Sequence, residues 1–149
     1  MARNRIELSL ESKNLLSKIN KAGGNIDRAA YEAAQKGAEV YEAALRAACN
    51  TDRVPDSITN HIESEVEQSG NRTTVAVGWR LSNYDPNNPS PGFKAIFLNY
   101  GTPRRTTNKG ANRGAIVGGG FIGRAKKVSK GLIRQAQEKF LNEVLKELK

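Results

Sequence analysis

The sequence predicts an α+β fold, in which a small antiparallel β-sheet packs against a long central helix and a C-terminal amphipathic helix, with a long basic Gly-rich loop. Three observations predict it: a helical apolar period over residues 25–50, a period of two over residues 58–79, and a second helical period over residues 125–148. The chain has 149 residues, the length of one typical domain, so we expect residues 1–149 to form a single domain.

Two elements are expected before the long helix. The apolar residues alternate from Ile6 to Leu10, which predicts a strand-like arm. Residues 11–21 carry their apolar side chains at helical spacing and run into two glycines, so they are predicted to form a short helix.

The long helix is predicted over residues 25–50, where Ala, Gly and Tyr recur at steps of three and four. Asn25 or Asp27 can cap its start. Two i,i+4 ion pairs of favourable orientation lie on the opposite face: Glu32 with Lys36, and Glu42 with Arg46. The apolar face consists mainly of small residues, so another backbone can approach it closely.

A β-hairpin is predicted after Pro55, because the period changes to two. Strands are expected from Ile58 to Glu67 and from Thr73 to Trp79, with a turn around Gly70. One outer face of the hairpin is acidic, and Trp79 is expected to pack in the core or at its rim.

The chain after this hairpin is less regular. Residues 82–92 have the composition of a surface turn, and residues 93–100 are expected to form a third strand or a buried short element. Residues 101–124 contain no acid and seven glycines, which predicts a long loop of the kind that is usually functional or disordered.

The final helix is predicted over residues 125–148, with one apolar face. That face consists of Val128, Leu132, Ile133, Ala136, Phe140, Leu141, Val144, Leu145 and Leu148. Ordering its backbone costs roughly 1–2 kcal/mol per residue. We therefore expect this helix to pack on the sheet or on another subunit.

The composition favours a protein that relies on partners. Leu, Ile, Val and Phe total 32 residues, about 21% of the chain, which is close to the limit below which chains stay disordered. A single thiol, Cys49, cannot form an internal disulfide, so a reducing compartment is expected. No signal peptide or membrane-spanning run is recognisable, and we expect no membrane partner.

The positive charge is concentrated in one segment. The chain carries +9 overall, but no acidic residue occurs between Asp85 and Glu138, an interval with ten Lys and Arg residues. We expect this basic segment, residues 94–134, to face a partner or DNA through Arg104, Arg105, Lys109, Arg113, Arg124, Lys126, Lys127 and Lys130. The alternative is a solvated loop whose charge only aids solubility.

Sequence-specific DNA recognition is not indicated. Residues 101–120 contain no aromatic ring for base stacking, and neither a helix-turn-helix pattern nor zinc-ligand spacing is present. Contact with the phosphate backbone of duplex DNA remains an open alternative.

The motifs for catalysis or cofactor binding are weak. Gly118-x-Gly120-x-x-Gly123 matches the dinucleotide fingerprint by letter, but no second strand follows the helix. His61 is the single histidine, and a Cys49/His61 nucleophilic pair would require Cys49 to leave a helix face where it is expected to be an apolar filler. We therefore predict no catalytic, cofactor-binding or metal-binding residue, and no enzyme activity.

An acidic row is predicted on one strand, formed by Glu63, Glu65 and Glu67. Such a row is commonly a solvated edge that discourages strand addition. It could instead meet the basic segment of a neighbouring copy, which would produce a ring by head-to-tail association.

Two stretches carry a resemblance to a known family: Lys94-Ala-Ile-Phe-Leu-Asn-Tyr-Gly-Thr102 and Gly120-Phe-Ile-Gly-Arg-Ala125. Together with the order of the predicted elements, they resemble the HK97 gene-10-like family of tailed-phage and prophage proteins. Asn99 stands where that family usually has Glu, and Gly120 and Arg124 replace two prolines. The resemblance assigns structural roles to Tyr100, Gly101, Thr102, Phe121 and Ala125.

The resemblance implies a structural virion protein without catalysis, made in the host cytoplasm and acting in head-tail joining or tail completion at the neck or tail. Its implied partners are other copies of itself in a ring, together with connector, head-completion or tail-tube proteins. Gly101 is expected to permit a backbone turn, and Phe121 to anchor the last helix. The alternative function is sequence-independent DNA binding through residues 94–134.

Overall fold

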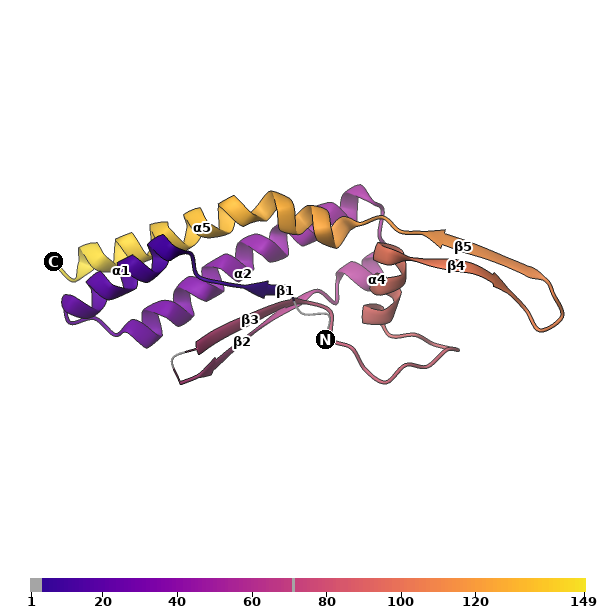
Figure 1. Ribbon diagram of the computed structural model, residues 1–149, viewed down its shortest axis with the longest axis horizontal. Helices are drawn as coiled ribbons and strands as arrows, with labels where there is room; N and C mark the ends of the chain where they lie inside the picture. Colours follow the sequence, from indigo (N-terminus) through magenta and orange to yellow (C-terminus); the bar gives the residue numbers. More distant parts are fainter. Residues whose placement is uncertain (1–3, 71) are drawn as a thin grey trace.

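The computed structural model describes residues 4–70 and 72–149. The molecule is elongated: three helices lie along one another, a small sheet covers one side of them, and a hairpin projects from one end (Figure 1). The helices are α1 (Leu10–Lys21), α2 (Ile26–Thr51), α3 (Asp56–Thr59), α4 (Pro91–Tyr100) and α5 (Phe121–Glu147). The strands are β1 (Asn4–Ile6), β2 (Glu63–Ser69), β3 (Arg72–Gly78), β4 (Gly101–Thr106) and β5 (Asn112–Val117). The predicted α+β class is confirmed.

The long helix α2 forms as predicted, and its small face packs closely on α5. The side chain of Asn25 accepts a hydrogen bond from the Arg28 amide at 3.0 Å and caps the first turn. A Cβ at Gly37 would lie 2.8 Å from Nε2 of Gln137 on α5, so glycine makes this approach possible. The small-residue face therefore lets side chains of α5 lie close to the backbone of α2.

One of the two predicted ion pairs on α2 forms. Arg46 pairs with Glu42 at 3.0 Å, but Glu32 pairs with Arg28 at 2.8 Å, and Lys36 with Glu39 at 3.3 Å. The pairing of Glu32 with Lys36 was wrong because each of them has another partner within one helical turn.

The main sheet has the order β1-β3-β2, and both pairings are antiparallel. Val75 and Val77 are fully buried in the core. The predicted hairpin is confirmed over β2 and β3, but its first strand begins at Glu63 rather than Ile58. Ile58 lies instead in α3, where Pro55 starts a short helical turn that the Arg46 guanidinium holds through the carbonyl of Thr59 at 3.0 Å.

Trp79 lies in the core, as predicted. It is 2% exposed, and its Nε1 donates to the carbonyl of Ile58 at 2.8 Å. Its ring meets that of Phe121 edge-on, with centroids 6.1 Å apart. This pair joins the end of the sheet to the start of α5.

Residues 93–100 lie in a helix, α4, so the first alternative, a strand, was wrong, whereas the second, a short element, agrees with a helix of ten residues that is partly buried. Pro91 occupies the first helical turn, where its missing N–H costs nothing, and Gly101 ends the helix with a φ of 81°. Ala95 and Asn99, one turn apart, are its buried residues together with Gly92.

Residues 101–124 are not one long loop, because half of them form a second two-stranded sheet from β4 and β5 and the last four belong to α5. The Thr102 hydroxyl accepts from the Ile116 amide at 3.1 Å, and the Thr107 amide donates to the carbonyl of Ala111 at 2.8 Å. Gly110 and Gly114 adopt positive φ values, which accommodate the turn and an irregularity in register. The glycines therefore shape a hairpin.

The last helix begins at Phe121, four residues earlier than predicted, and most of its predicted apolar face packs on the core. Leu141 is fully buried, and Ile133, Ala136, Phe140, Val144 and Leu145 are half-buried. The prediction was wrong at Val128, Leu132 and Leu148, which are 68%, 50% and 39% exposed. Ser129 and Gln137 are also buried, and Gln137 fits because it meets Gly37 of α2.

Candidate assembly interface

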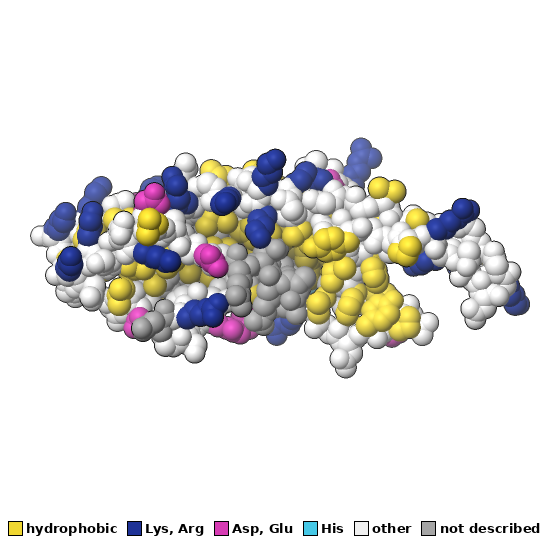
Figure 2. Space-filling model, in the orientation of Figure 1, with side chains coloured by type: hydrophobic (Ala, Val, Ile, Leu, Met, Phe, Trp, Pro, Cys, Tyr) yellow, Lys and Arg dark blue, Asp and Glu magenta, His cyan; other side chains and the backbone are white. Residues whose placement is uncertain are grey.

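The hairpin arm, residues 101–117, projects from the body of the molecule (Figure 1). It carries four cationic side chains, all exposed: Arg104, Arg105, Lys109 and Arg113. Figure 2 shows Lys and Arg side chains along this arm with no acidic side chain beside them. Among the residues that the structure describes, none of the four forms an ion pair with a carboxylate. The arm is a positively charged projection that meets little of its own chain.

The base of the arm is fixed by α4. The carbonyl of Leu98 accepts from the Gly119 amide at 2.9 Å, and the carbonyl of Asn99 accepts from the Gly120 amide at 3.0 Å. A Cβ at Gly101 would lie 2.6 Å from the carbonyl oxygen of Ile116, so the backbone leaves no room for a side chain at this position. These contacts hold both ends of the arm against one helix.

Asn99 also caps α5 from outside that helix. The N-cap position is Gly120, which offers no side chain. The buried Oδ1 of Asn99 accepts instead from the Ile122 amide at 2.9 Å. One side chain of α4 thus satisfies a backbone donor that would otherwise lack a partner at the start of α5.

The other residues of the two motif stretches also lie at this junction. Phe121 and Ala125 are 1% and 2% exposed, so both side chains lie in the core at the start of α5. Thr102 pairs with Ile116 inside the arm. Tyr100, by contrast, is 72% exposed.

Arg124 differs from the other predicted partner-facing cations. Its guanidinium forms an ion pair with Asp52 at the end of α2 and a hydrogen bond with the carbonyl of Gly119. The hydrogen bond that Arg124 donates to Asp52 raises the pKa of Arg124 above its ordinary value. This side chain ties α5 to α2 within one molecule.

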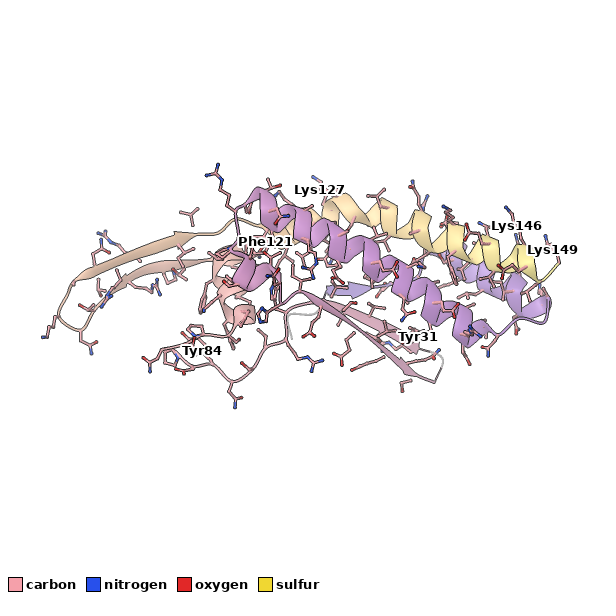
Figure 3. All side chains as sticks on the ribbon, turned by 180° about the vertical axis from the view of Figure 1, so that it is seen from behind. Tyr31, Tyr84, Phe121, Lys127, Lys146 and Lys149 are labelled. Atoms are coloured by element: carbon pink, nitrogen blue, oxygen red, sulfur yellow. The ribbon has the colours of Figure 1, made fainter. Side chains whose placement is uncertain are left out.

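The remaining predicted cations, Lys126, Lys127 and Lys130, lie on the first half of α5 and are exposed. Figure 3 shows Lys127 directed outward on this helix, while Phe121 lies at the junction where the helix begins. The structure therefore divides the basic segment into two groups, one on the hairpin arm and one on α5.

An apolar surface on α4 was missed by the sequence analysis. The α4 patch consists of Phe93, Phe97 and Tyr100, with Tyr84 from the preceding loop. Tyr84 is 53% exposed, and its ring centroid lies 5.0 Å from that of Phe93 and 6.2 Å from that of Phe97. In Figure 2 apolar side chains gather below the base of the arm, where Figure 1 places α4. The i,i+4,i+7 spacing of these aromatic residues could have revealed the patch if residues 93–100 had been treated as a helix.

The acidic row lies on one face of β2 and is not close to the arm. Figure 1 shows β2 below the helices, whereas the arm projects from the end of the molecule at the right of the view. Arg80 pairs with Glu63 at 3.2 Å and approaches Glu65 at 3.9 Å. Glu67 and Glu65 also have interactions within the chain. The two charged surfaces therefore face different directions.

The two residues considered for catalysis, Cys49 and His61, lie in different environments. Cys49 is fully buried, and burial raises the pKa of its thiol to about 11. His61 lies on an exposed turn after α3. Within residues 4–70 and 72–149, no three His, Cys, Asp or Glu side chains gather closely enough to bind a metal ion. Over the same residues, no helix combines the length and apolar character needed to cross a membrane.

Comparison with known families gives one match. Residues 13–101, more than half of the chain, match the family described as "Bacteriophage HK97-gp10, putative tail-component". The matched part runs from α1 to the first residue of β4, so the hairpin arm and α5 lie beyond it. No curated protein and no solved structure matches the chain. The chain belongs to the HK97-gp10-like family of bacteriophage tail components.

Proposed function

We propose that this protein is a structural component that completes the tail or joins it to the head, and that it acts by binding and without catalysis. The observation that carries the proposal is the hairpin arm, whose four cations lack an acidic partner among the described residues of their own chain. A two-stranded hairpin is marginally stable by itself in water. A neighbouring protein in the virion would supply the packing surface that an isolated two-stranded hairpin lacks.

The α4 patch supports the same role. Interfaces are enriched in aromatic residues, and the exposed Tyr84 packs on the half-buried rings of Phe93 and Phe97. A partner that follows the arm down to its base would meet charge first and then apolar surface. This combination favours a protein partner, such as a connector, head-completion or tail-tube protein, over DNA.

The test is complementation of a phage that lacks the gene for this protein. The variant Arg104→Glu/Arg105→Glu/Lys109→Glu/Arg113→Glu should fold normally and yield separate heads and tails in electron micrographs, with a strong loss of infectious titre. A matched control reverses charges at Lys139 and Lys146, which lie far along α5. Normal titre with the arm variant would contradict the proposal.

Self-association in a ring is the second part of the proposal. The arm of one copy would meet the acidic row of the next, in a head-to-tail contact that closes with rotation. The exposed pair between Arg80 and Glu63 is worth little in water, so it can give way to a contact between subunits.

Charge exchange tests the ring. Glu63→Lys/Glu65→Lys/Glu67→Lys should abolish the oligomer in light scattering, and the arm variant above should do the same. Combining both sets in one chain should restore it, because the attractive pairing is re-formed with opposite signs. An oligomer that survives the triple reversal would reject this contact.

Sequence-independent DNA binding is the alternative function, and the exposed cations of the arm favour it. Because phosphate contacts release counterions, such binding weakens steeply as salt rises. The logarithm of the binding constant for duplex DNA should then fall linearly with the logarithm of the salt concentration. Binding should also depend on Arg104 and Arg105. Absence of retention at low salt would exclude this alternative.

A further inference from the structure

A groove of about 700 Å³ lies between the end of β1 and the first half of α5, and the proposed function does not use it. Ile6 of β1 and residues 7–9, which lead from β1 to α1, form one wall, and the first half of α5 forms the other. Tyr41 of α2 also lines the groove.

β1 is an edge strand. In the order β1-β3-β2 it has a strand neighbour on one side only. The unpaired N–H and C=O groups of an edge strand form a template for an added strand. A segment in extended conformation, lying in the groove, could pair with this edge while facing α5.

The floor of the groove contains an unsatisfied amide. Gln137 is 1% exposed, and neither Nε2 nor Oε1 has a hydrogen-bond partner among the described residues. Leaving such a group unpaired costs about 1–3 kcal/mol, so its presence needs a reason. A side-chain amide has one donor side and one acceptor side, which match the C=O and N–H of a peptide backbone.

The rim is basic on the α5 side. Lys126, Lys130 and Arg134 follow one another at one-turn intervals along the groove. Arg134 lies 3.5 Å from Glu138 and 4.0 Å from Glu11, whereas the two lysines form no ion pair with a described carboxylate. The wall formed by residues 6–9 contributes one acid, Glu7. The net charge of the lining is therefore positive.

We propose that this groove binds an extended acidic segment of a partner protein, with apolar side chains alternating with Asp or Glu. The backbone of the segment pairs with the edge of β1 at Ile6, its carboxylates meet Lys126 and Lys130, and its apolar side chains enter the groove. The amide of Gln137, which lies against Gly37 in the free protein, turns to pair with the backbone of the segment. A DNA phosphate backbone would offer no apolar group to Ile6, Leu8 and Ile133. The inference extends the proposed function by giving the chemistry of a second partner segment, which a virion protein would supply.

Nuclear magnetic resonance with a defined probe tests the groove. The probe is an acetylated and amidated peptide of alternating Glu and Val, and its control has Lys in place of Glu. The acidic peptide should shift the amide signals of Leu8 and Ile133 and the side-chain NH2 pair of Gln137. The basic peptide should shift none of these.

Variants separate charge from hydrogen bonding. Lys126→Glu/Lys130→Glu should weaken the acidic peptide roughly tenfold or more, because two attractive contacts become repulsive. Lys139→Glu/Lys146→Glu, a change of the same charge on the same helix outside the groove, should leave affinity unchanged. Gln137→Leu should weaken binding yet raise the thermal midpoint, since it removes a buried unsatisfied amide. A glutamine with only a structural role would give a lower midpoint.

Several results would overturn the proposal. These are no binding at millimolar peptide, equal binding of the basic peptide, or shifts confined to the hairpin arm. Shifts of the same groove signals with protein concentration alone would identify another copy of this chain as the occupant, against a partner segment. The arm variant should bind the peptide normally, so failure here and failure of the assembly role are distinguishable.

Discussion

Replacing Asn99 tests how the arm is held. In Asn99→Ala, the Ile122 amide keeps its buried position but loses the acceptor that lies 2.9 Å away. Loss of a helix cap typically costs about 1 kcal/mol, and an unsatisfied buried donor costs about 1–3 kcal/mol. Because the two costs describe the same hydrogen bond, we expect a total of about 2 kcal/mol. For a chain of this length, that lowers the thermal midpoint by roughly 4–8 °C.

The assay is thermal and urea unfolding followed by circular dichroism, with amide hydrogen exchange at Ile122. Asn99→Asp keeps an oxygen acceptor and places negative charge at a helix N-terminus, so it should lose less stability than the alanine variant. Asn142→Ala is the matched control, because the Asn142 side chain donates to the carbonyl of Glu138 on the exposed face of α5. Wild-type unfolding and unchanged exchange at Ile122 in Asn99→Ala would refute the capping role.

Four further outcomes follow from the packing. Gly101→Ala should lower the free energy of unfolding in urea by about 2 kcal/mol or more, because its φ of 81° suits glycine and its Cβ would meet a carbonyl oxygen. Phe121→Ala should cost about 3–5 kcal/mol in the same assay, as expected for a buried aromatic residue. Trp79→Phe should lower the thermal midpoint through loss of the 2.8 Å bond to Ile58, and an unchanged midpoint would contradict this. Burial raises the pKa of Cys49 to about 11, so the folded chain retains a proton that the unfolded chain loses near pH 9. Stability should therefore fall as pH rises from about 9 to 11, and Cys49→Val should reduce that slope.

The parts of the fold that depend on local signals could be predicted from the sequence. The α2 helix follows from its period and from the cap at Asn25, and the β2–β3 hairpin follows from its alternation and its turn around Gly70. In the helix and in the hairpin, local propensity and the pattern of buried residues favour the same structure, so tertiary contacts change only where each element begins and ends.

Two predicted elements were wrong because their local patterns are ambiguous. Residues 93–100 are a short, largely apolar run, and such a run does not distinguish a strand from a helix by period alone. The seven glycines in residues 101–124 lower the strand propensity and favour a loop, so the sequence does not predict β4 and β5. These strands form through contacts across the hairpin, such as that between Thr102 and Ile116.

For the candidate interface on the hairpin arm, the sequence predicts the positive charge but not the shape. The cationic residues of the arm are apparent from the missing acids, but their separation from the cations of α5 requires the hairpin. Gln137 could not be recognised as a buried amide, because its burial depends on Gly37 of α2. The predicted face of α5 has the correct period and is buried or half-buried from Ile133 to Leu145, whereas Val128 and Leu132 at its start are exposed.

The central claim is that the hairpin arm contacts another protein in the virion. A photoreactive residue in place of Lys109, at the turn of the arm, tests it in purified particles, with the same residue at Lys146 as the control. The account predicts that the Lys109 position crosslinks to a second copy or to a neck or tail protein. Crosslinks to DNA alone, or no crosslink beyond that of the control, would contradict it.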